Sequence, residues 1–423
     1  PKKLNDKELL LVKGLINQGI IVEESKLKKT PRSYEEAQFC NECVANDFII
    51  PGLEFDENGI CPMCANKDEA KKLKSVLPTI NDIPYNKKGR FDIALFYTGG
   101  KDSTYLLYYL SKVLKLRVLA LTWEIPFMSE SAKVSIENAK NMFSNVEFIS
   151  RRVSNKDLIK MYSKLYELNG NTCACPTLAY VLFFPDLVIN KVPYFVAGNE
   201  PVQIIGFYYN NIAPKITFTF HDNKFLNFLI NVGRVITLHP PLKKGQFHTL
   251  MTMNELARGN KLTKFLKYRN TILENVRLSI NEIEHIRKPL KKFIRKSSWT
   301  GNIPAFINID LNKIAGGVYD WKKIKDILVK EAGWVAPKEE VKGLHTSCSI
   351  EKCKEYSQFI KFYQMESTII PFSALELALA SRNKNVSKEE ALKEMKECMG
   401  FSLEEISECQ IMKDYLNSLN NND

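Results

Sequence analysis

The chain has 423 residues and a formal net charge of +12, with 45 % hydrophobic and 26 % charged residues. This length exceeds one ordinary domain, and the composition is that of a globular protein with a substantial core, which excludes a disordered or fibrous chain. No apolar run approaches the roughly 20 residues of a membrane span, and the charged N-terminus lacks the apolar stretch of a signal peptide, so the sequence predicts a cytoplasmic protein.

The N-terminal part of the sequence predicts a helix followed by a metal-binding segment. Apolar residues recur at helical spacing between Asp6 and Gln18. Two C-x₂-C pairs follow, separated by seventeen residues. Four thiolates at this spacing close a tetrahedral shell around zinc and leave no position for a water molecule. We therefore expect a structural Zn²⁺ bound by Cys40, Cys43, Cys61 and Cys64.

From Phe91 onward the hydrophobic pattern alternates between strands and helices. We expect strands at 93–96, 116–123, 146–152 and 194–198, and helices at 129–143 and 157–168. Strands that alternate with helices of this length are typical of βαβ units and a parallel sheet. The sequence therefore predicts an α/β fold whose ligands bind beyond the carboxyl ends of the strands.

A glycine-containing turn connects the first predicted strand to the helix that follows it. A strand, a glycine turn and a helix start aim backbone N–H groups at an anion, and two adjacent glycines let the backbone approach a phosphate closely. Ser103 adds a hydroxyl group and Lys101 a positive charge. We predict a phosphate site formed by Tyr97, Thr98, Gly99, Gly100, Lys101, Asp102 and Ser103.

Two further strand ends are expected at the same edge of the sheet. One ends the second predicted strand and the other ends the last predicted strand. Because the carboxyl ends of parallel strands meet at one edge, we expect these residues to border the phosphate site and to bind the nucleoside. They are Thr122, Trp123, Gly198, Asn199 and Glu200.

Three of the remaining cysteines are candidates for chemistry. Cys173 and Cys175 form a C-x-C pair that is too tight for an ordinary zinc knuckle, whereas Cys348 lies near Cys353 and His345. A cysteine that carries sulfur must be reached as a thiolate, so it should be partly exposed and close to positive charge. We expect Cys173, Cys175 and Cys348 to converge near the nucleotide. The alternative is that they are inert buried thiols.

Beyond His221 the pattern changes to successive helices. Capping boxes at Ser387 and Ser402 predict two helix starts, and Gly400 predicts the end of the first of these helices. The segment 243–296 carries fourteen Lys/Arg against four Glu, which indicates either a solvated helical face or a docking surface for an anionic partner. We expect an N-terminal helix and zinc-ribbon segment (1–90), a nucleotide-binding domain (91–220) and a helical region that binds substrate or partner (221–423).

The glycine turn in this setting resembles the PP-loop of the ATP pyrophosphatases, the adenine nucleotide α-hydrolase-like superfamily. The two cysteine pairs with the phrase GLEFDENGIC, and the stretches DWKKIKDILVKEAGW and SKEEALKEM, are similar to N-acetyl sugar amidotransferases within it. The chain also resembles the PP-loop thioamide synthetases of natural-product pathways. The resemblance implies a Rossmann-like, HUP-type fold, ATP and Mg²⁺ as cofactors, and catalytic roles for Lys101, Asp102 and Ser103.

The resemblance also implies a shared reaction, in which a substrate carbonyl oxygen attacks the α-phosphorus of ATP and a nucleophile then displaces AMP. Related enzymes that deliver sulfur use cysteines outside the ribbon as persulfide carriers or as ligands of an iron–sulfur cluster. Lys101 departs from the sugar amidotransferases, which usually carry Val at this position. We therefore predict sulfur replacement, with Cys173, Cys175 and Cys348 as the sulfur-handling residues.

The predicted substrate is a small-molecule or carrier-protein-bound amide, which would become a thioamide. The alternative is amidation of an N-acetyl sugar with ammonia from a separate glutaminase. RNA as a partner, with thiolation of a tRNA base, is less favoured, as is a non-catalytic nucleotide-binding scaffold. In both favoured reactions a donor protein supplies the sulfur or the ammonia, and the oligomeric state stays open.

Overall fold

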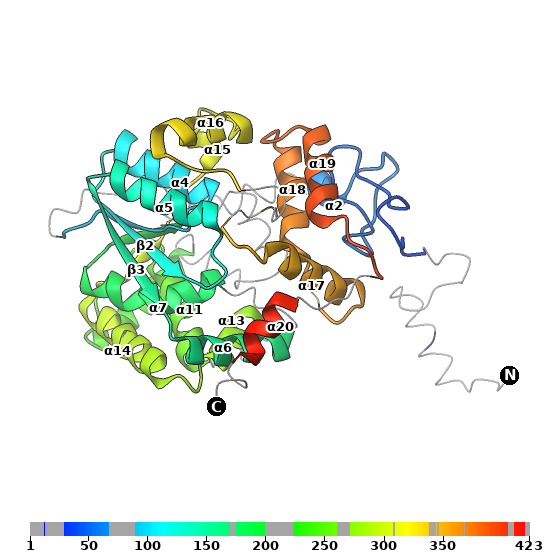
Figure 1. The fold of residues 1–423 in the computed structure, drawn as a ribbon. Coiled ribbons are helices and arrows are strands. Elements are labelled where there is room, and N and C mark those ends of the chain that lie inside the picture. Colours follow the sequence, from blue (N-terminus) through cyan, green and yellow to red (C-terminus); the bar gives the residue numbers. More distant parts are fainter. Residues whose placement is uncertain are drawn as a thin grey trace.

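The computed structural model describes residues 12, 29–66, 89–169, 175–198, 223–259, 271–307, 309–337, 344, 347–367, 369–404 and 410–418. Its centre is a five-stranded parallel sheet in the order β3-β2-β1-β4-β5 (Figure 1). The strands are β1 (Ile93–Phe96), β2 (Val118–Glu124), β3 (Val146–Arg152), β4 (Tyr194–Ala197) and β5 (Ala305–Phe306). The order reverses at β1, as in a doubly wound α/β fold, and this confirms the predicted fold class.

The two central strands are buried on both faces. All four residues of β1 are buried, and so are the first six of β2. Ile93 and Leu95 belong to the hydrophobic cluster on one face of the sheet, whereas Ala94 and Phe96 belong to the cluster on the other. A parallel sheet covered on both faces has continuous apolar strands, which explains why these strands were visible in the sequence.

Helices cover both faces of the sheet (Figure 1). On one face lie α4 (Lys101–Tyr108), its π-helical continuation η3 (Tyr109–Val113), α5 (Glu130–Met142) and α16 (Trp321–Ala332). On the other lie α6 (Asn155–Asn169), α7 (Cys175–Ile189), α11 (Gln246–Arg258), α13 (Thr271–Ser279) and α14 (Glu284–Thr300). The crossovers therefore use both sides of the sheet, as a switch in strand order requires.

The four-cysteine segment packs against helices from the other end of the chain (Figure 1). These helices are α17 (Glu351–Tyr363), α18 (Phe372–Arg382) and α19 (Lys388–Met399), and the segment itself contains α2 (Pro62–Ala65). The Arg382 guanidinium donates to the Met63 carbonyl at 2.6 Å, and the Lys388 ammonium donates to the Cys40 carbonyl at 2.9 Å. The N-terminal metal-binding segment and the C-terminal helices thus form one layer.

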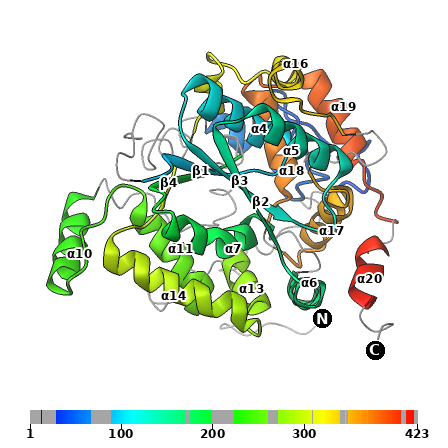
Figure 2. The same ribbon diagram turned by 60° about the vertical axis from the view of Figure 1, so that its left-hand side comes forward.

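Three helices complete the described structure: α10 (Lys224–Ile236), α15 (Leu311–Ile314) and α20 (Gln410–Asn417). Figure 2 shows α10 at the periphery, beside α11 and α14, and α20 at the opposite side of the molecule. None of the described helices combines the length and apolar character that a membrane crossing requires.

The predicted elements of the central domain agree with the structure to within two residues at each end. Ser129 caps α5 by accepting a hydrogen bond from the Ala132 N–H. Ser387 opens α19 with the predicted capping box, and this helix ends at Gly400 as predicted. The predicted helix at Asp6–Gln18 lies outside the described residues except for one position, and so does most of the helix expected after Ser402.

Two elements in and around the sheet were not predicted. The segment 175–189 forms the helix α7, where no helix or strand was expected. The chain beyond His221 was expected to be mainly helical, and the described residues confirm this. The unpredicted addition is β5, in which Ala305 and Phe306 form a fifth parallel strand beside β4.

Candidate functional site

The loop between β1 and α4 has a conformation that requires glycine. Gly99 has φ +74°, and a Cβ on it would lie 2.5 Å from the Ala132 carbonyl oxygen in α5. Gly100 is the N-cap of α4, and no side chain in the described structure caps this helix start. The first N–H groups of α4 are consequently presented at the loop, where the positive end of the helix dipole favours an anion.

Three hydroxyl groups brace the loop internally. The Oγ atoms of Thr98 and Ser103 lie 3.2 Å apart, and the Thr98 N–H donates to the Ser103 Oγ at 3.3 Å. The Ser103 hydroxyl donates to the Gly100 carbonyl at 3.1 Å, and so does the Thr104 hydroxyl at 2.8 Å. These contacts hold the loop in one shape before any ligand binds, which reduces the ordering cost of binding.

Gly198, directly after β4, closes the loop from the other side. A Cβ on Gly198 would lie 2.7 Å from the Ser103 nitrogen and 2.9 Å from the Ser103 Cα. The ends of β1 and β4 are neighbours at the point where the strand order reverses, which is where doubly wound folds bind ligands. The structure therefore brings the loop and Gly198 together, as the sequence analysis expected. Asn199 and Glu200 lie outside the described residues.

Thr122 and Trp123 lie at the end of β2 but are turned toward the protein. The Thr122 hydroxyl donates to the Tyr97 carbonyl at 2.9 Å, so it holds the start of the loop. Trp123 is buried in the cluster on the α6–α7 face, and its indole N–H has no hydrogen-bond partner in the described structure. A nucleoside contact for either residue stays a prediction.

Lys101 and Asp102 make contacts that the sequence analysis missed. The Asp102 Oδ1 accepts from the Tyr319 hydroxyl at 2.8 Å and pairs with the Lys101 ammonium at 2.7 Å. The Lys101 Nζ also lies 4.7 Å from the Tyr319 ring centroid and 4.3 Å from that of Trp321. Both side chains thus connect the start of α4 to Tyr319, and Lys101 also contacts Trp321, the first residue of α16. Their predicted roles toward phosphate and Mg²⁺ stay predictions.

Cys175 and Cys348 belong to one cluster, although 172 positions separate them in the sequence. The Cys175 Sγ lies 3.7 Å from the Tyr162 hydroxyl, and the Tyr162 ring stacks on Phe127 with centroids 6.3 Å apart. The Phe127 carbonyl accepts from the N–H of Ser349, the residue after Cys348, at 2.8 Å. The structure therefore brings these two thiols into one neighbourhood, whereas Cys173 and His345 lie outside the described residues.

This thiol neighbourhood adjoins the loop through the first turn of α5. The N–H of Ser129, the N-cap of α5, donates to the Ser347 carbonyl at 3.1 Å, directly before Cys348. One turn further along α5, the Ala132 carbonyl lies against Gly99. The thiols and the glycine loop therefore lie along the same edge of the sheet, connected by one helix start.

The protonation of Cys348 depends on burial and on a lysine that sequence reasoning did not identify. Cys348 is only 7 % exposed, and burial raises its pKa to about 11. It is therefore a protonated thiol at neutral pH, contrary to the expectation of an accessible thiolate, whereas Cys175 is half-buried. The nearby ammonium of Lys354 opposes this rise in pKa. Lys354 is itself buried and lies 3.6 Å from the Glu351 carboxylate.

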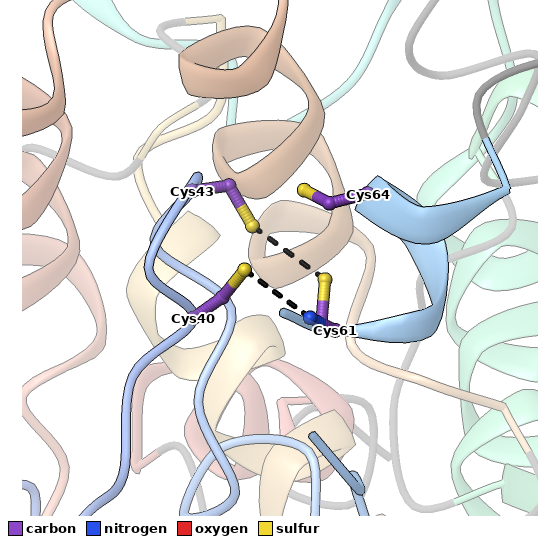
Figure 3. Close-up of side chains that lie close together, drawn as sticks. All are labelled: Cys40, Cys43, Cys61 and Cys64. Carbon is purple, nitrogen blue, oxygen red and sulfur yellow. Dashed lines mark hydrogen bonds between the residues drawn. The ribbon is translucent and has the colours of Figure 1, made fainter. Parts of the chain in front are cut away.

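The four N-terminal cysteines lie close together in an arrangement that could hold a metal ion (Figure 3). All four are buried, and their sulfur atoms lie within 4.8 Å of one another. The N–H of Cys61 donates to the Cys40 Sγ at 3.3 Å, and the Cys43 and Cys61 sulfurs are 3.8 Å apart. The hydrogen bond with Cys43 is the main cause that lowers the pKa of Cys61 to about 2. The same contact raises the pKa of Cys43, so this pair of sulfurs shares one proton, which a bound metal ion would displace.

These features define a doubly wound α/β protein with a glycine loop at the switch point of its sheet and a separate group of four cysteines that could hold a metal ion. No family model matches the chain, and no curated protein matches it. Among solved structures, it is similar to the U34-tRNA thiolase NcsA from Methanococcus maripaludis with its [4Fe-4S] cluster. The sequence identity is 16 %, the TM-score is 0.25, and the match covers 61 % of this chain and 86 % of that one. Because the TM-score is this low, the fold and the site are established from the geometry of this chain alone.

Proposed function

We propose that this protein is a PP-loop ATP pyrophosphatase that activates an amide or carbonyl oxygen with ATP and replaces it with sulfur. The observation that supports the proposal most is the position of the glycine loop. Its braced backbone and the uncapped start of α4 meet Gly198 at the switch point, with a pair of thiols at the same edge of the sheet. Such a loop supplies fixed donors where the charge of a leaving pyrophosphate develops.

The first step is adenylation. The carbonyl oxygen of the substrate attacks the α-phosphorus of ATP, and the bond to the β-phosphate breaks, which releases pyrophosphate and leaves an adenylated imidate. The N–H groups at the start of α4 stabilise the pyrophosphate charge, and the Ser103 hydroxyl joins them by turning away from the Gly100 carbonyl, its partner in the loop. Mg²⁺ that accompanies ATP would neutralise phosphate oxygens. The Oδ1 of Asp102 is engaged by Lys101 and Tyr319, and no step is assigned to this carboxylate.

The second step is sulfur transfer from a persulfide on Cys175, the more accessible thiol. The terminal sulfur attacks the activated carbon, and AMP leaves. Cys348 then loses its proton and attacks the Cys175 sulfur, which forms a disulfide and releases the product as a thioamide. A thiol reductant restores the two thiols, and a sulfur-donor protein reloads Cys175. The lysine near Cys348, Lys354, would stabilise the thiolate that this attack requires.

The four-cysteine site is proposed to hold one structural zinc ion. Four sulfurs about 2.3 Å from a tetrahedral Zn²⁺ are about 3.8 Å apart. The Cys43–Cys61 separation has this value, and none of the four sulfurs lies more than 4.8 Å from another. By contrast, an iron–sulfur cluster needs about three or four thiolates. Cys353 belongs to the same cluster as Cys175 and Cys348, but outside the four-cysteine site the described residues offer no three such ligands close together, so no step is derived through an iron–sulfur cluster.

Product analysis tests the proposal. Purified protein would be incubated with [α-³²P]ATP, a panel of small and carrier-bound amides, and either a ³⁵S-labelled persulfide donor or ¹⁵N-ammonium. We expect AMP and pyrophosphate in equal amounts, with ³⁵S in the organic product. Ser103→Ala should lower AMP formation by roughly a hundredfold. Cys175→Ala should abolish ³⁵S incorporation, while the control Cys398→Ala, which removes a cysteine of α19, should not.

The outcomes separate the candidate reactions. Incorporation of ¹⁵N with an N-acetyl sugar, unaffected by Cys175→Ala, would instead identify an amidotransferase. Formation of ADP and phosphate would contradict the proposed PP-loop chemistry altogether.

A further inference from the structure

The helix α10 presents an apolar stripe to solvent. Phe225, Phe228 and Ile236 are 72 %, 65 % and 75 % exposed. With other exposed apolar side chains they follow the spacing i, i+3, i+4, i+7, i+10 and i+11, which places them on one side of a helix. No residue of α10 itself is buried. The stripe consists of Phe225, Phe228, Leu229, Val232, Val235 and Ile236.

The other side of α10 is firmly attached, so the exposure does not result from an undocked helix. Leu226 and Ile230 pack against a small cluster that includes Phe247 of α11. At the C-terminal end, the Arg234 guanidinium donates to the Pro240 carbonyl at 2.8 Å and to the Ser298 carbonyl of α14 at 3.0 Å. The stripe is therefore the outward face of a fixed helix.

A basic surface adjoins this stripe. The helix α14 carries six Lys/Arg and one Glu, and Lys288, Lys292, Arg295 and Lys296 on it are exposed. Its Trp299 is 59 % exposed and meets His239, just after α10, with ring centroids 5.4 Å apart. Figure 2 shows α10 and α14 as neighbours at the same side of the molecule. The exposed apolar stripe and the exposed cationic side chains thus lie on neighbouring helices that meet at His239 and Trp299.

Such a surface has the features of a helix-docking site. Large contiguous apolar patches are rare on soluble monomers and mark interaction sites. A narrow stripe with this spacing matches the seam of another amphipathic helix, and adjacent lysine and arginine side chains select acidic flanks. If a second copy of this chain covered the stripe, two strongly basic surfaces would come together. Charge repulsion therefore disfavours self-association at this surface.

We propose that the α10 stripe and the basic face of α14 dock a partner protein through an amphipathic helix with an apolar seam and acidic flanks. This proposal does not depend on the reaction proposed above. It extends the expectation of an anionic partner, which rested on charge alone, by adding an apolar anchor that only the structure reveals. Charge complementarity would speed the encounter, and the apolar seam would slow dissociation.

Two synthetic helical peptides test this proposal on the full chain. Both have three heptads with Leu at the seam positions, and one carries Glu and the other Lys on the flanks. Fluorescence anisotropy should show that the acidic peptide binds at least about tenfold more tightly than the basic one, with affinity that falls as salt rises. Phe228→Ser with Leu229→Ser should abolish this binding. The control Val134→Ser, which changes an exposed apolar residue of α5, should not.

Reversal of the charge on the basic face of α14 provides a second test. Lys292→Glu, Arg295→Glu and Lys296→Glu together should invert the preference toward the basic peptide. Equal binding of both peptides, or binding of neither, would overturn the proposal. It would also be overturned if sedimentation showed a dimer that Leu229→Ser dissociates, or if phosphatidylserine vesicles bound the chain while the peptides did not. Loss of ATP chemistry in these variants is not expected, so failure here is distinct from failure of the proposed reaction.

Discussion

Gly198→Ala tests the packing between β4 and the glycine loop most sharply. A Cβ at this position would lie 2.7 Å from the Ser103 nitrogen, which is about 0.7 Å short of the 3.4 Å lower bound of ordinary contact. The obstructing atoms are backbone at the start of α4, so they cannot rotate away. The loop and the strand must separate instead.

The expected effects follow from that displacement. Overpacking of this kind costs about 1–3 kcal/mol of unfolding free energy. A shift approaching 1 Å at a reacting group lowers turnover by roughly a hundredfold. In this protein the displaced groups are the loop N–H donors proposed to bind the ATP phosphates, so ATP binding should weaken as well. We therefore expect a modest loss of stability in urea unfolding, together with a large loss of ATP affinity in isothermal titration calorimetry.

Gly233→Ala is the matched control. Gly233 lies within α10, and a Cβ there would meet no heavy atom within 4 Å. Replacing a helical glycine with alanine should raise stability by about 0.5–1 kcal/mol and leave ATP binding unchanged. If Gly198→Ala binds ATP as tightly as Gly233→Ala does, the loop and the end of β4 do not form the nucleotide site.

Three further predictions concern metal, thiol and acid. Cys61→Ser should remove the one zinc per chain found by elemental analysis and lower the melting temperature; a metal-free wild type that is stable in chelator would refute this. Lys354→Met should raise the Cys348 pKa further, so iodoacetamide should label Cys348 more slowly at each pH, and an unchanged pH profile in mass spectrometry would refute the lysine's influence. Burial lowers the pKa of His248 in the folded chain to about 4, whereas the ordinary pKa of histidine is near 6.5. Between these two values only the unfolded chain binds the proton, so the free energy of unfolding is highest above about pH 6.5 and falls as the pH is lowered toward 4. Urea unfolding should show a loss of roughly 1–2 kcal/mol between about pH 7 and pH 5 that His248→Phe removes; equal pH dependence in both proteins would contradict it.

The parts of the fold that local patterns determine could be predicted from the sequence. β1 and β2 are continuous apolar runs, and α5 has both an N-cap and an amphipathic stripe, so their limits are encoded locally. The helix α7 could not be recognised in this way. Its residues 175–189 are apolar on nearly all sides and include Pro185 inside the helix, so no helical periodicity stands out. β5 has two residues, and its pairing with β4 determines it.

In the candidate site, too, local features could be predicted from the sequence, whereas contacts made by tertiary packing could not. The glycine loop could be predicted because its requirement for glycine and a helix start is local. The contacts of Lys101 with Tyr319 and Trp321 join residues more than two hundred positions apart, and no sequence pattern specifies them. Lys354 looked like an ordinary lysine of an amphipathic helix, and only the packing of α17 shows that it is buried beside Cys348. The exposed stripe of α10 was likewise invisible, because apolar periodicity normally indicates a face turned to the core.

Hydrogen–deuterium exchange of the loop amides tests the central claim most directly, since it needs no knowledge of the acceptor substrate. If the loop at residues 98–104 binds the phosphates of ATP through backbone N–H groups, ATP should slow exchange at these amides in the wild type and not in Gly198→Ala. Adenosine, which lacks phosphates, should leave the same amides unchanged. ATP-dependent protection elsewhere in the chain, with no change at residues 98–104, would contradict the account.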